Sequence, residues 1–130
     1  MKIFKISYFV FALILLAITG FKLKDDSGVQ ITILTPTENA NIKMGDTVFI
    51  SANVSSDNAL HDVSVKVKTA DNLLTLYSEN IHTHGSQLAI SKNYIQTIKY
   101  KTELLLEIST RDHSGTVTAT ATRKFFSDKK

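Results

Sequence analysis

Cysteine is absent from the 130 residues of this chain. Its absence excludes disulfide bonds, thiol catalysis and thiolate metal sites, so the fold must be held together by packing alone. Tryptophan is also absent, and one proline and five glycines impose few breaks on the backbone. Because Val, Ile, Thr and Tyr are spread through the chain after residue 28, the composition predicts one ordered domain built from strands,.

A strong excess of charge of one sign is missing as well. Lysine and arginine outnumber aspartate and glutamate by 15 to 12, a net charge of +3. Two of the lysines, Lys2 and Lys5, lie in the N-terminal segment, which leaves 13 basic against 12 acidic residues, or +1, for the rest. Without a basic stripe there is no electrostatic footprint for nucleic acid, and we expect no nucleic-acid partner.

The N-terminus has the order of a secretory signal, because two lysines precede a wholly apolar run at residues 8–18,. That run is shorter than the roughly 20 residues of a membrane-spanning helix. We therefore expect a hydrophobic signal helix at residues 1–20, either cleaved or retained as an anchor, then a linker at 21–28 and a domain at 29–127. Phe21 stands where a bacterial lipoprotein signal requires cysteine. The segment predicts export to the periplasm, cell envelope or extracellular space, with membrane contact only through an uncleaved N-terminus.

Runs of alternating apolar and polar residues predict strands along the remaining chain. In the run at 47–54, Val48 and Ile50 are expected to point inward and Phe49 outward. The pattern fades between residues 79 and 85, and a short strand is allowed around Ile42. The expected strands before the last hairpin are residues 30–35, 47–54, 60–68, 73–78, 87–91 and 94–98.

The final part of the chain predicts a β-hairpin, because a polar break ending in Gly115 separates two alternating runs,. We expect the apolar members of each run to share one face. In the first run these are Leu104, Leu106, Ile108 and Thr110, and in the second they are Val117, Ala119, Ala121 and Phe125. Strands with one polar face are typical of antiparallel sheets. The row Thr118, Thr120, Thr122 and Lys124 is therefore either a solvated face or an edge that a partner strand could join.

Four motifs carry a family resemblance. They are Ile-x-Ile-x-x-Pro at 31–36, Gly-Asp-x-Val-x-Ile-x-Ala-x-Val at 45–54, Asp-Asn-x-Leu at 57–60, and Leu-x-Ile-x-Thr-x-Asp-x-Ser-Gly-x-Val at 106–117. This order resembles bacterial immunoglobulin-like and fibronectin type III-like modules, most of all single-domain envelope lipoproteins of unknown function. The resemblance implies an all-β, Ig-like Greek-key sandwich of about seven antiparallel strands. The chain departs from it in lacking the lipoprotein cysteine and a third-strand tryptophan, and in having Leu104 where many relatives have tyrosine.

Two groups of residues are candidate metal ligands. If the sandwich forms, the loops at Asp57–Asn58 and Asp112 meet at one end with the linker carboxylates of Asp25 and Asp26, and oxygen ligands from several segments suit calcium. These residue types also form turns, which needs no ion.

The second candidate group contains His82 and His84, whose spacing points both rings to one side of a strand and suits a transition metal. His61 or Asp62 would supply a third ligand if the fold brought either near. The alternative is solvated histidines on a surface loop.

Catalysis is not expected. Asp112, His113 and Ser114 include the residue types of a catalytic triad, but the side chains of contiguous residues diverge and cannot form its geometry. The aromatic residues Phe49, Tyr77, Tyr94 and Tyr100 are scattered singly. The sequence thus predicts a non-catalytic exported module with a binding or structural role at the cell envelope, whose partner is an envelope protein or polymer and which needs no cofactor. The alternative is a calcium- or zinc-dependent ligand-binding or adhesion domain.

Overall fold

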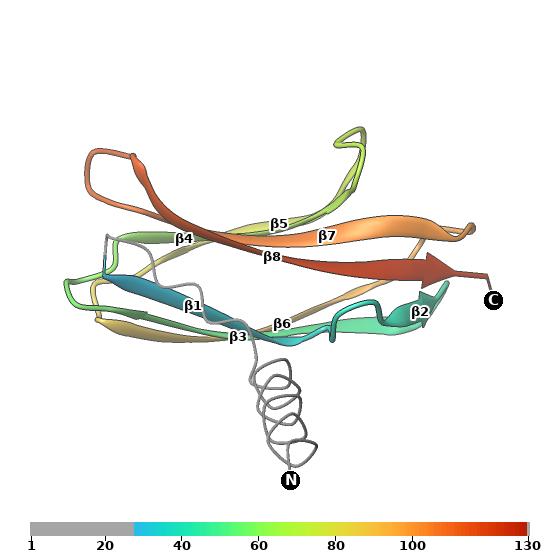
Figure 1. The fold of residues 1–130 in the computed structure, drawn as a ribbon, viewed down its shortest axis with the longest axis horizontal. Helices are drawn as coiled ribbons and strands as arrows, with labels where there is room; N and C mark the ends of the chain where they lie inside the picture. The colour runs from blue at the N-terminus through green and yellow to red at the C-terminus, as the bar shows by residue number, and fades with distance from the viewer. Residues whose placement is uncertain (1–27, 130) are drawn as a thin grey trace, which may run out of the picture.

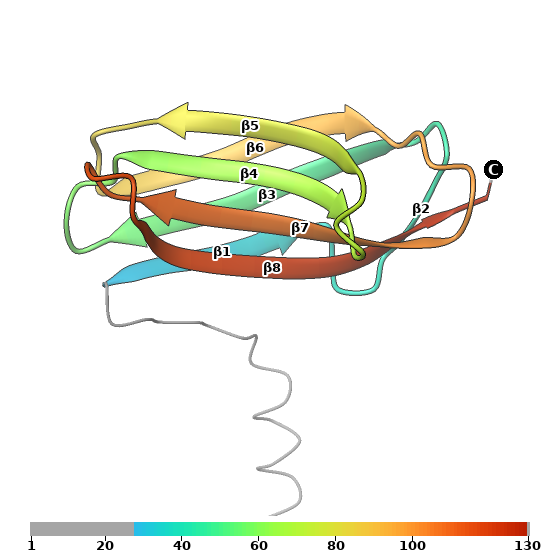
Figure 2. The same ribbon diagram turned by 90° about the horizontal axis from the view of Figure 1, so that it is seen from above.

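The structure is a computed structural model that describes residues 28–129. These residues form two β-sheets that lie face to face, as Figures 1 and 2 show from two directions. The described residues contain no helix, and none of their elements is a helix long and apolar enough to cross a membrane. The expected signal helix at 1–20 lies outside the described residues, as do all but the last residue of the expected linker.

Three strands form the smaller sheet, in the order β1-β3-β6. They are β1 (Val29–Thr35), β3 (Thr47–Ser56) and β6 (Gln87–Ile95). The larger sheet has the order β2-β8-β7-β4-β5. Its strands are β2 (Asn41–Lys43), β4 (Asp62–Thr69), β5 (Thr75–His82), β7 (Thr102–Arg111) and β8 (Val117–Asp128). The chain crosses repeatedly between the sheets, so strands adjacent in sequence often lie in different layers, and the expected all-β, Ig-like sandwich is confirmed.

The number and direction of the strands differ slightly from the expectation. Residues 28–129 form eight strands, compared with the expected seven or so, and the short strand around Ile42 is one of them. This strand, β2, runs parallel to β8, with Asn41 opposite Phe126. All other strand pairs are antiparallel.

The core lies between the sheets and follows the alternation of the sequence. Val48 and Ile50 of β3 are buried, whereas Phe49 between them is 64% exposed. Leu104, Leu106 and Ile108 of β7 are fully buried, and so are all three valines of β4. Burial of each such side chain contributes about 1.5–3 kcal/mol, which makes this core the main source of stability.

Three expectations about individual strands are wrong. The strand expected at 73–78 is β5, which continues to His82, and the two short strands expected at 87–91 and 94–98 are one strand, β6, which ends at Ile95. Both β5 and β6 are edge strands whose residues are mostly exposed or half-buried, so their alternation in the sequence is weak. Val117, expected to point inward, is 46% exposed because it begins β8 beside a register shift at Arg111, beyond the core.

The row of threonines on β8 lies on an edge strand over most of its length, since β2 pairs only with residues 126–128 of β8. The side chain of Arg123 spans the gap to the other sheet. Its Nη2 donates to the carbonyl of Ile33 at 2.9 Å and its Nη1 to the carbonyl of Pro36 at 3.2 Å. Arg123 therefore bridges the two sheets at this edge of the sandwich, and strand addition at the threonine row stays a prediction.

Candidate functional site

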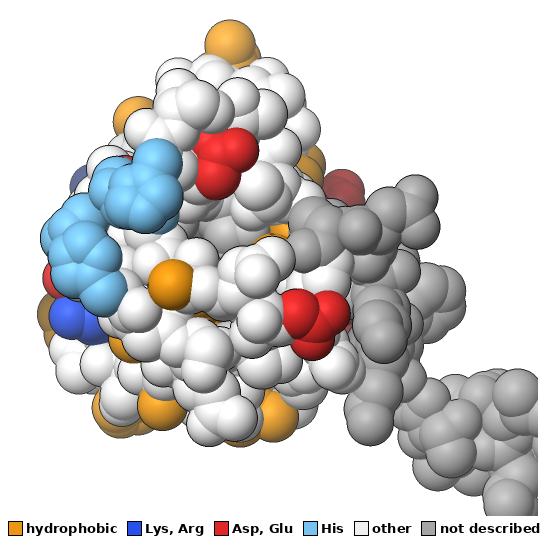
Figure 3. Space-filling view, turned by 90° about the vertical axis from the view of Figure 1, so that its left-hand side faces the viewer, with side chains coloured by type: hydrophobic (Ala, Val, Ile, Leu, Met, Phe, Trp, Pro, Cys, Tyr) orange, Lys and Arg blue, Asp and Glu red, His pale blue; other side chains and the backbone are white. Residues whose placement is uncertain are grey.

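All four histidines of the chain lie together at one loop end of the sandwich. They form the pale-blue patch in Figure 3. His61 precedes β4, His82 is the last residue of β5, His84 follows in the β5–β6 loop, and His113 lies in the turn between β7 and β8. With Asp62, the first residue of β4, they define what we call the histidine end.

Strand register explains how these residues meet. In the antiparallel pair β4–β5, Asp62 lies directly opposite His82, although twenty residues separate them in sequence. Directly opposed residues on neighbouring strands have Cβ atoms only about 5 Å apart, within reach of side-chain contact. The loop that follows is held against β4, because the N–H of Thr83 donates to the carbonyl of His61 at 2.9 Å.

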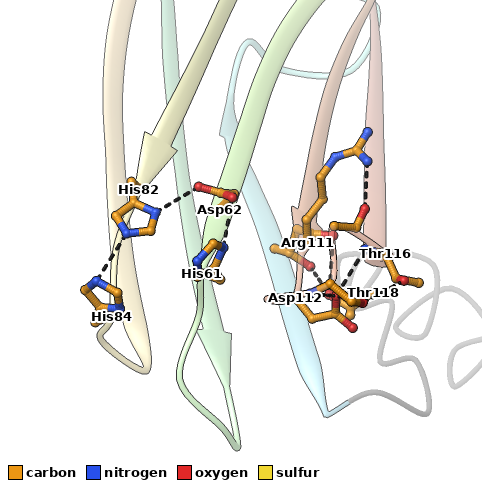
Figure 4. A network of polar contacts seen from close by, with 11 residues as sticks. His61, Asp62, His82, His84, Arg111, Asp112, Thr116 and Thr118 are labelled. Carbon is orange, nitrogen blue, oxygen red and sulfur yellow. Dashed lines mark hydrogen bonds and ion pairs between the residues drawn. The ribbon is translucent and has the colours of Figure 1, made fainter.

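Asp62 is the centre of a hydrogen-bonded chain (Figure 4). Its Oδ2 lies 2.9 Å from Nδ1 of His61, and its Oδ1 lies 3.0 Å from Nδ1 of His82. On the other side of the His82 ring, Nε2 lies 3.1 Å from Nε2 of His84. One carboxylate thus connects two imidazoles, and a third imidazole continues the chain.

The rings pack against each other as well. The centroids of His61 and His82 are 4.6 Å apart, as are those of His82 and His84, and both pairs meet edge to face at 89°. The centroids of His61 and His84 are 6.2 Å apart. His113 contacts the remaining side of the group, with its centroid 4.2 Å from that of His61.

The histidine end is partly exposed and carries a stabilised negative charge. The side chain of His82 is 54% exposed and that of Asp62 33%. The hydrogen bond from His82 lowers the pKa of Asp62 below its ordinary value; His61 lowers it further, against an opposing effect of desolvation. Asp62 is therefore an anion at neutral pH, and each of its oxygens accepts a hydrogen bond from a ring.

This group has the composition of a metal site. Ligand atoms of His61, Asp62 and His82 all lie within 4.8 Å of one another. Imidazole and carboxylate are common ligands of zinc and other transition metals. In residues 28–129 no serine or threonine hydroxyl bonds to a histidine ring.

Sequence reasoning identified His82 and His84 and offered His61 or Asp62 as the third ligand, and the structure brings all four together. It did not connect His113 with this group. No signal in the sequence could have done so, because that contact depends on where the β7–β8 turn lies relative to the start of β4.

The candidate calcium ligands also lie near this end. Asn58 and Asp112 line one small hollow, together with Leu60 and Arg111. Oδ1 of Asp112 accepts hydrogen bonds from the backbone N–H groups of Ser114 and Thr116, both at 3.0 Å, and from the Ser114 hydroxyl. The hydrogen bond from that hydroxyl is the largest of the effects that lower the pKa of Asp112.

Asp57 lies beside Gly28, whose carbonyl accepts a hydrogen bond from the Asp57 N–H at 3.1 Å. Gly28 has a φ of 73°, and a Cβ there would lie 2.5 Å from the Asp57 carboxylate. Among the described residues Asp57 and Asp112 join no group of three close ligands. Asp25 and Asp26 lie outside those residues, so calcium binding stays a prediction.

The contacts of Ser114 describe a turn. Its hydroxyl bonds to Asp112 and lies 3.0 Å from the hydroxyl of Thr116, while His113 packs on His61. Asp112 thus organises the β7–β8 turn through its acceptor oxygen.

Comparisons with known proteins agree with this architecture. Residues 30–87, which run from β1 to the start of β6, match the family model of a bacterial Ig domain. Fibronectin type III-like modules of CbhA from Clostridium thermocellum share the fold with a TM-score of 0.52 and 14% identity, over 76% of this chain and 97% of theirs. Residues 30–87 are therefore similar to a bacterial Ig domain, and the described residues have the fold of an Ig-like or fibronectin type III-like sandwich.

A family 76 glycoside hydrolase from a bovine Bacteroides thetaiotaomicron strain is also similar over 75% of this chain and 20% of its own, at 7% identity and a TM-score of 0.41. No curated protein sequence gives a significant match.

Proposed function

We propose that this protein is an exported, non-catalytic Ig-like module that binds a partner, or serves as a structural part, at the cell envelope. The observation that carries the proposal is the distribution of its side chains. Apolar residues fill the space between the sheets, while all four histidines gather on one exposed loop end. Loops at the end of a rigid sandwich are a common place for binding residues.

Two further observations support the parts of this proposal. The charged and then apolar order of residues 1–20 supports export, through a signal that is cleaved or retained as an anchor,. A non-catalytic role is supported by the partners of the histidine rings, because among residues 28–129 the rings bond to Asp62 and to each other and to no serine or threonine hydroxyl,. The partner is an envelope protein or polymer and not nucleic acid, since the chain lacks a basic stripe.

Export is tested by expressing the full chain with a C-terminal Strep tag in a bacterial host, followed by cell fractionation and N-terminal sequencing. We expect the protein outside the cytoplasm. A mature N-terminus just after Thr19 or Gly20 identifies a cleaved signal, and an intact N-terminus in the membrane fraction identifies an anchor. Recovery of the folded protein in the cytoplasm would contradict export.

Binding is tested by cross-linking and pull-down from envelope extract with the same tagged chain. The variant His82→Gln/His84→Gln alters the histidine end, and Ser91→Ala/Asn93→Ala alters two exposed positions of β6 as the matched control. We expect capture of an envelope component that the histidine variant loses and the β6 control variant retains. Equal capture by all three proteins would place binding elsewhere. A lack of any partner, together with a deletion strain without an envelope phenotype, would count against the proposal.

A further inference from the structure

The rings of His61, His82 and His84 lie close to one another at the histidine end. Their centroids form a triangle with sides of 4.6, 4.6 and 6.2 Å. Imidazoles bound tetrahedrally to one zinc ion at about 2.0–2.1 Å would have centroids roughly 5 Å apart. The two sides that include His82 are close to that spacing, and the side between His61 and His84 is about 1.2 Å longer, so one of these two rings must rotate toward the other to share an ion,. The ligand atoms that already lie within 4.8 Å of one another belong to His61, Asp62 and His82.

The nearest pair of nitrogens points to the same place. Nε2 of His82 and Nε2 of His84 lie 3.1 Å apart. Two nitrogens on one tetrahedral zinc lie roughly 3.3 Å apart. Without an ion, one of these nitrogens must donate a proton to the other; with an ion, both can present lone pairs to it.

Asp62 prepares two of the rings for this role. It accepts hydrogen bonds at Nδ1 of both His61 and His82, which places a proton on each Nδ1 and leaves each Nε2 with a free lone pair,. Metal-binding histidines commonly donate their other N–H to a carboxylate in this way, and that partner fixes the tautomer and the ring orientation. The negative charge of Asp62 also offsets part of the charge of a divalent cation.

We propose that His61, His82 and His84 bind one divalent transition-metal ion, such as zinc, nickel or copper, and that Asp62 positions the ligands. Neutral imidazole suits these metals, whereas calcium and magnesium prefer sets of oxygen ligands. Three protein ligands leave a position for water or for a ligand from a partner. The inference goes beyond the proposed function, because the ion would bind whether or not the protein is exported.

The site is tested by isothermal titration of the full chain, Strep-tagged, in mild detergent and freed of metal with a chelator. The probes are the chlorides of zinc, nickel and calcium. We expect one zinc or nickel ion per chain and no binding of calcium at this site. X-ray absorption at the zinc edge should then show three imidazole nitrogens around the ion.

Substitutions test which residues bind the ion and which one positions the ligands. His82→Gln/His84→Gln should weaken zinc binding by at least about 100-fold, since two ligands are lost. Asp62→Asn should weaken it by roughly 10–100-fold while three nitrogens remain around the ion, as expected of a positioning residue. Thr120→Ala is the matched surface control and should bind like the wild type.

Several results would overturn the inference. They are the absence of zinc and nickel binding, equal affinity in the double histidine variant, or a loss in His113→Gln as large as that in the double variant. The metal site and the proposed function can fail independently of each other. A cytoplasmic protein that binds zinc would overturn export alone, and an exported protein that captures a partner but binds no metal would overturn the metal site alone.

Discussion

At the end of the sandwich opposite the histidines, a buried polar side chain bonds to the backbone, whereas at the histidine end exposed titratable side chains bond to one another. Gln96, just after β6, is completely buried. Its Nε2 donates to the carbonyl of Ile42 at 3.2 Å, and its Oε1 accepts the N–H of Ile98 at 2.8 Å. We call this region the Gln96 end.

The backbone of Gln96 adds two further bonds. Its carbonyl accepts the N–H of Gly45 at 2.8 Å, and its N–H donates to the carbonyl of Asp46 at 2.9 Å. The residue therefore connects the segment around β2 with the chain that leaves β6. The side-chain amide and the backbone N–H and carbonyl of Gln96 all bond to backbone groups, so Gln96 has a structural role.

The contrast indicates where binding chemistry can lie in such a module. A buried amide whose partners are backbone groups fixes loops, and its removal affects folding. An exposed imidazole whose partner is another side chain can exchange that partner for a ligand. Substitution of the buried amide should therefore change the free energy of unfolding, and substitution of the exposed imidazole should change ligand binding.

The largest effect is expected for Gln96→Ala at the Gln96 end. The change leaves the carbonyl of Ile42 and the N–H of Ile98 without their partner, and unsatisfied buried groups cost about 1–3 kcal/mol each,. We expect the free energy of unfolding to fall by about 2–4 kcal/mol in urea titrations followed by circular dichroism. Gln87→Ala, at an exposed glutamine that begins β6, should stay within about 0.5 kcal/mol,. If the two variants change the free energy of unfolding by similar amounts, the structural role of Gln96 is contradicted.

The sequence predicts the core far better than either end. Alternation at 47–54 and 60–68 places Val48, Ile50 and the valines of β4 correctly, because each inward position follows from its neighbours by a period of two,. The pairing of Asp62 with His82 follows from no local rule. It depends on the β4–β5 register, which the weak alternation of an edge strand does not specify,.

The roles of individual polar residues follow even less from the sequence. Gln96 lies within a strand expected at 94–98, where nothing in the sequence distinguishes a completely buried amide from an exposed one. The sequence indicates that His113 is part of a turn. Its contact with His61 depends on the relative position of two loops, which the sequence does not give. In both cases the role of the residue is set by long-range packing, whereas the spacing of His82 and His84 could be read directly.

Zinc should stabilise the protein through the histidine end alone. At a free concentration one hundred times the dissociation constant, an ion that binds only the folded state adds about 2.7 kcal/mol. We expect this increment in the wild type and, because the ends are far apart and share no partner, also in Gln96→Ala. The variant His82→Gln/His84→Gln should lose it. A zinc effect that persists in that variant would mean that the ion binds elsewhere.

Without metal, the same double histidine variant should be nearly as stable as the wild type. His82 and His84 are exposed, and exposed substitutions away from the core usually change stability by less than about 0.5 kcal/mol,. Urea titrations in the presence of a chelator measure this directly. A fall in the free energy of unfolding of about 2 kcal/mol or more would equal the cost of an unsatisfied buried polar group. It would mean that these histidines have a structural role like that of Gln96.

The smallest effect concerns the charge of Asp62. The hydrogen bond from His82 is the largest of the effects that hold its pKa below the ordinary value of 3.8, so His82→Ala should raise the pKa of Asp62 in a carboxyl NMR titration. A depressed pKa contributes stability that is present above the ordinary value and is lost as the pH falls through the lower, folded value. The variant should therefore lose less stability on acidification below pH 3.8 than the wild type.

Asp112 provides the internal control for this titration, because its pKa is lowered mainly by the Ser114 hydroxyl. His82→Ala should leave the Asp112 resonance unchanged while that of Asp62 moves. If both pKa values rise together, the substitution has disturbed the whole loop end. The change at Asp62 then cannot be assigned to the loss of its contact with His82. If only Asp62 moves, the carboxylate responds to the ring that it orients, as expected of a side chain that prepares a ligand and unlike the buried amide of Gln96.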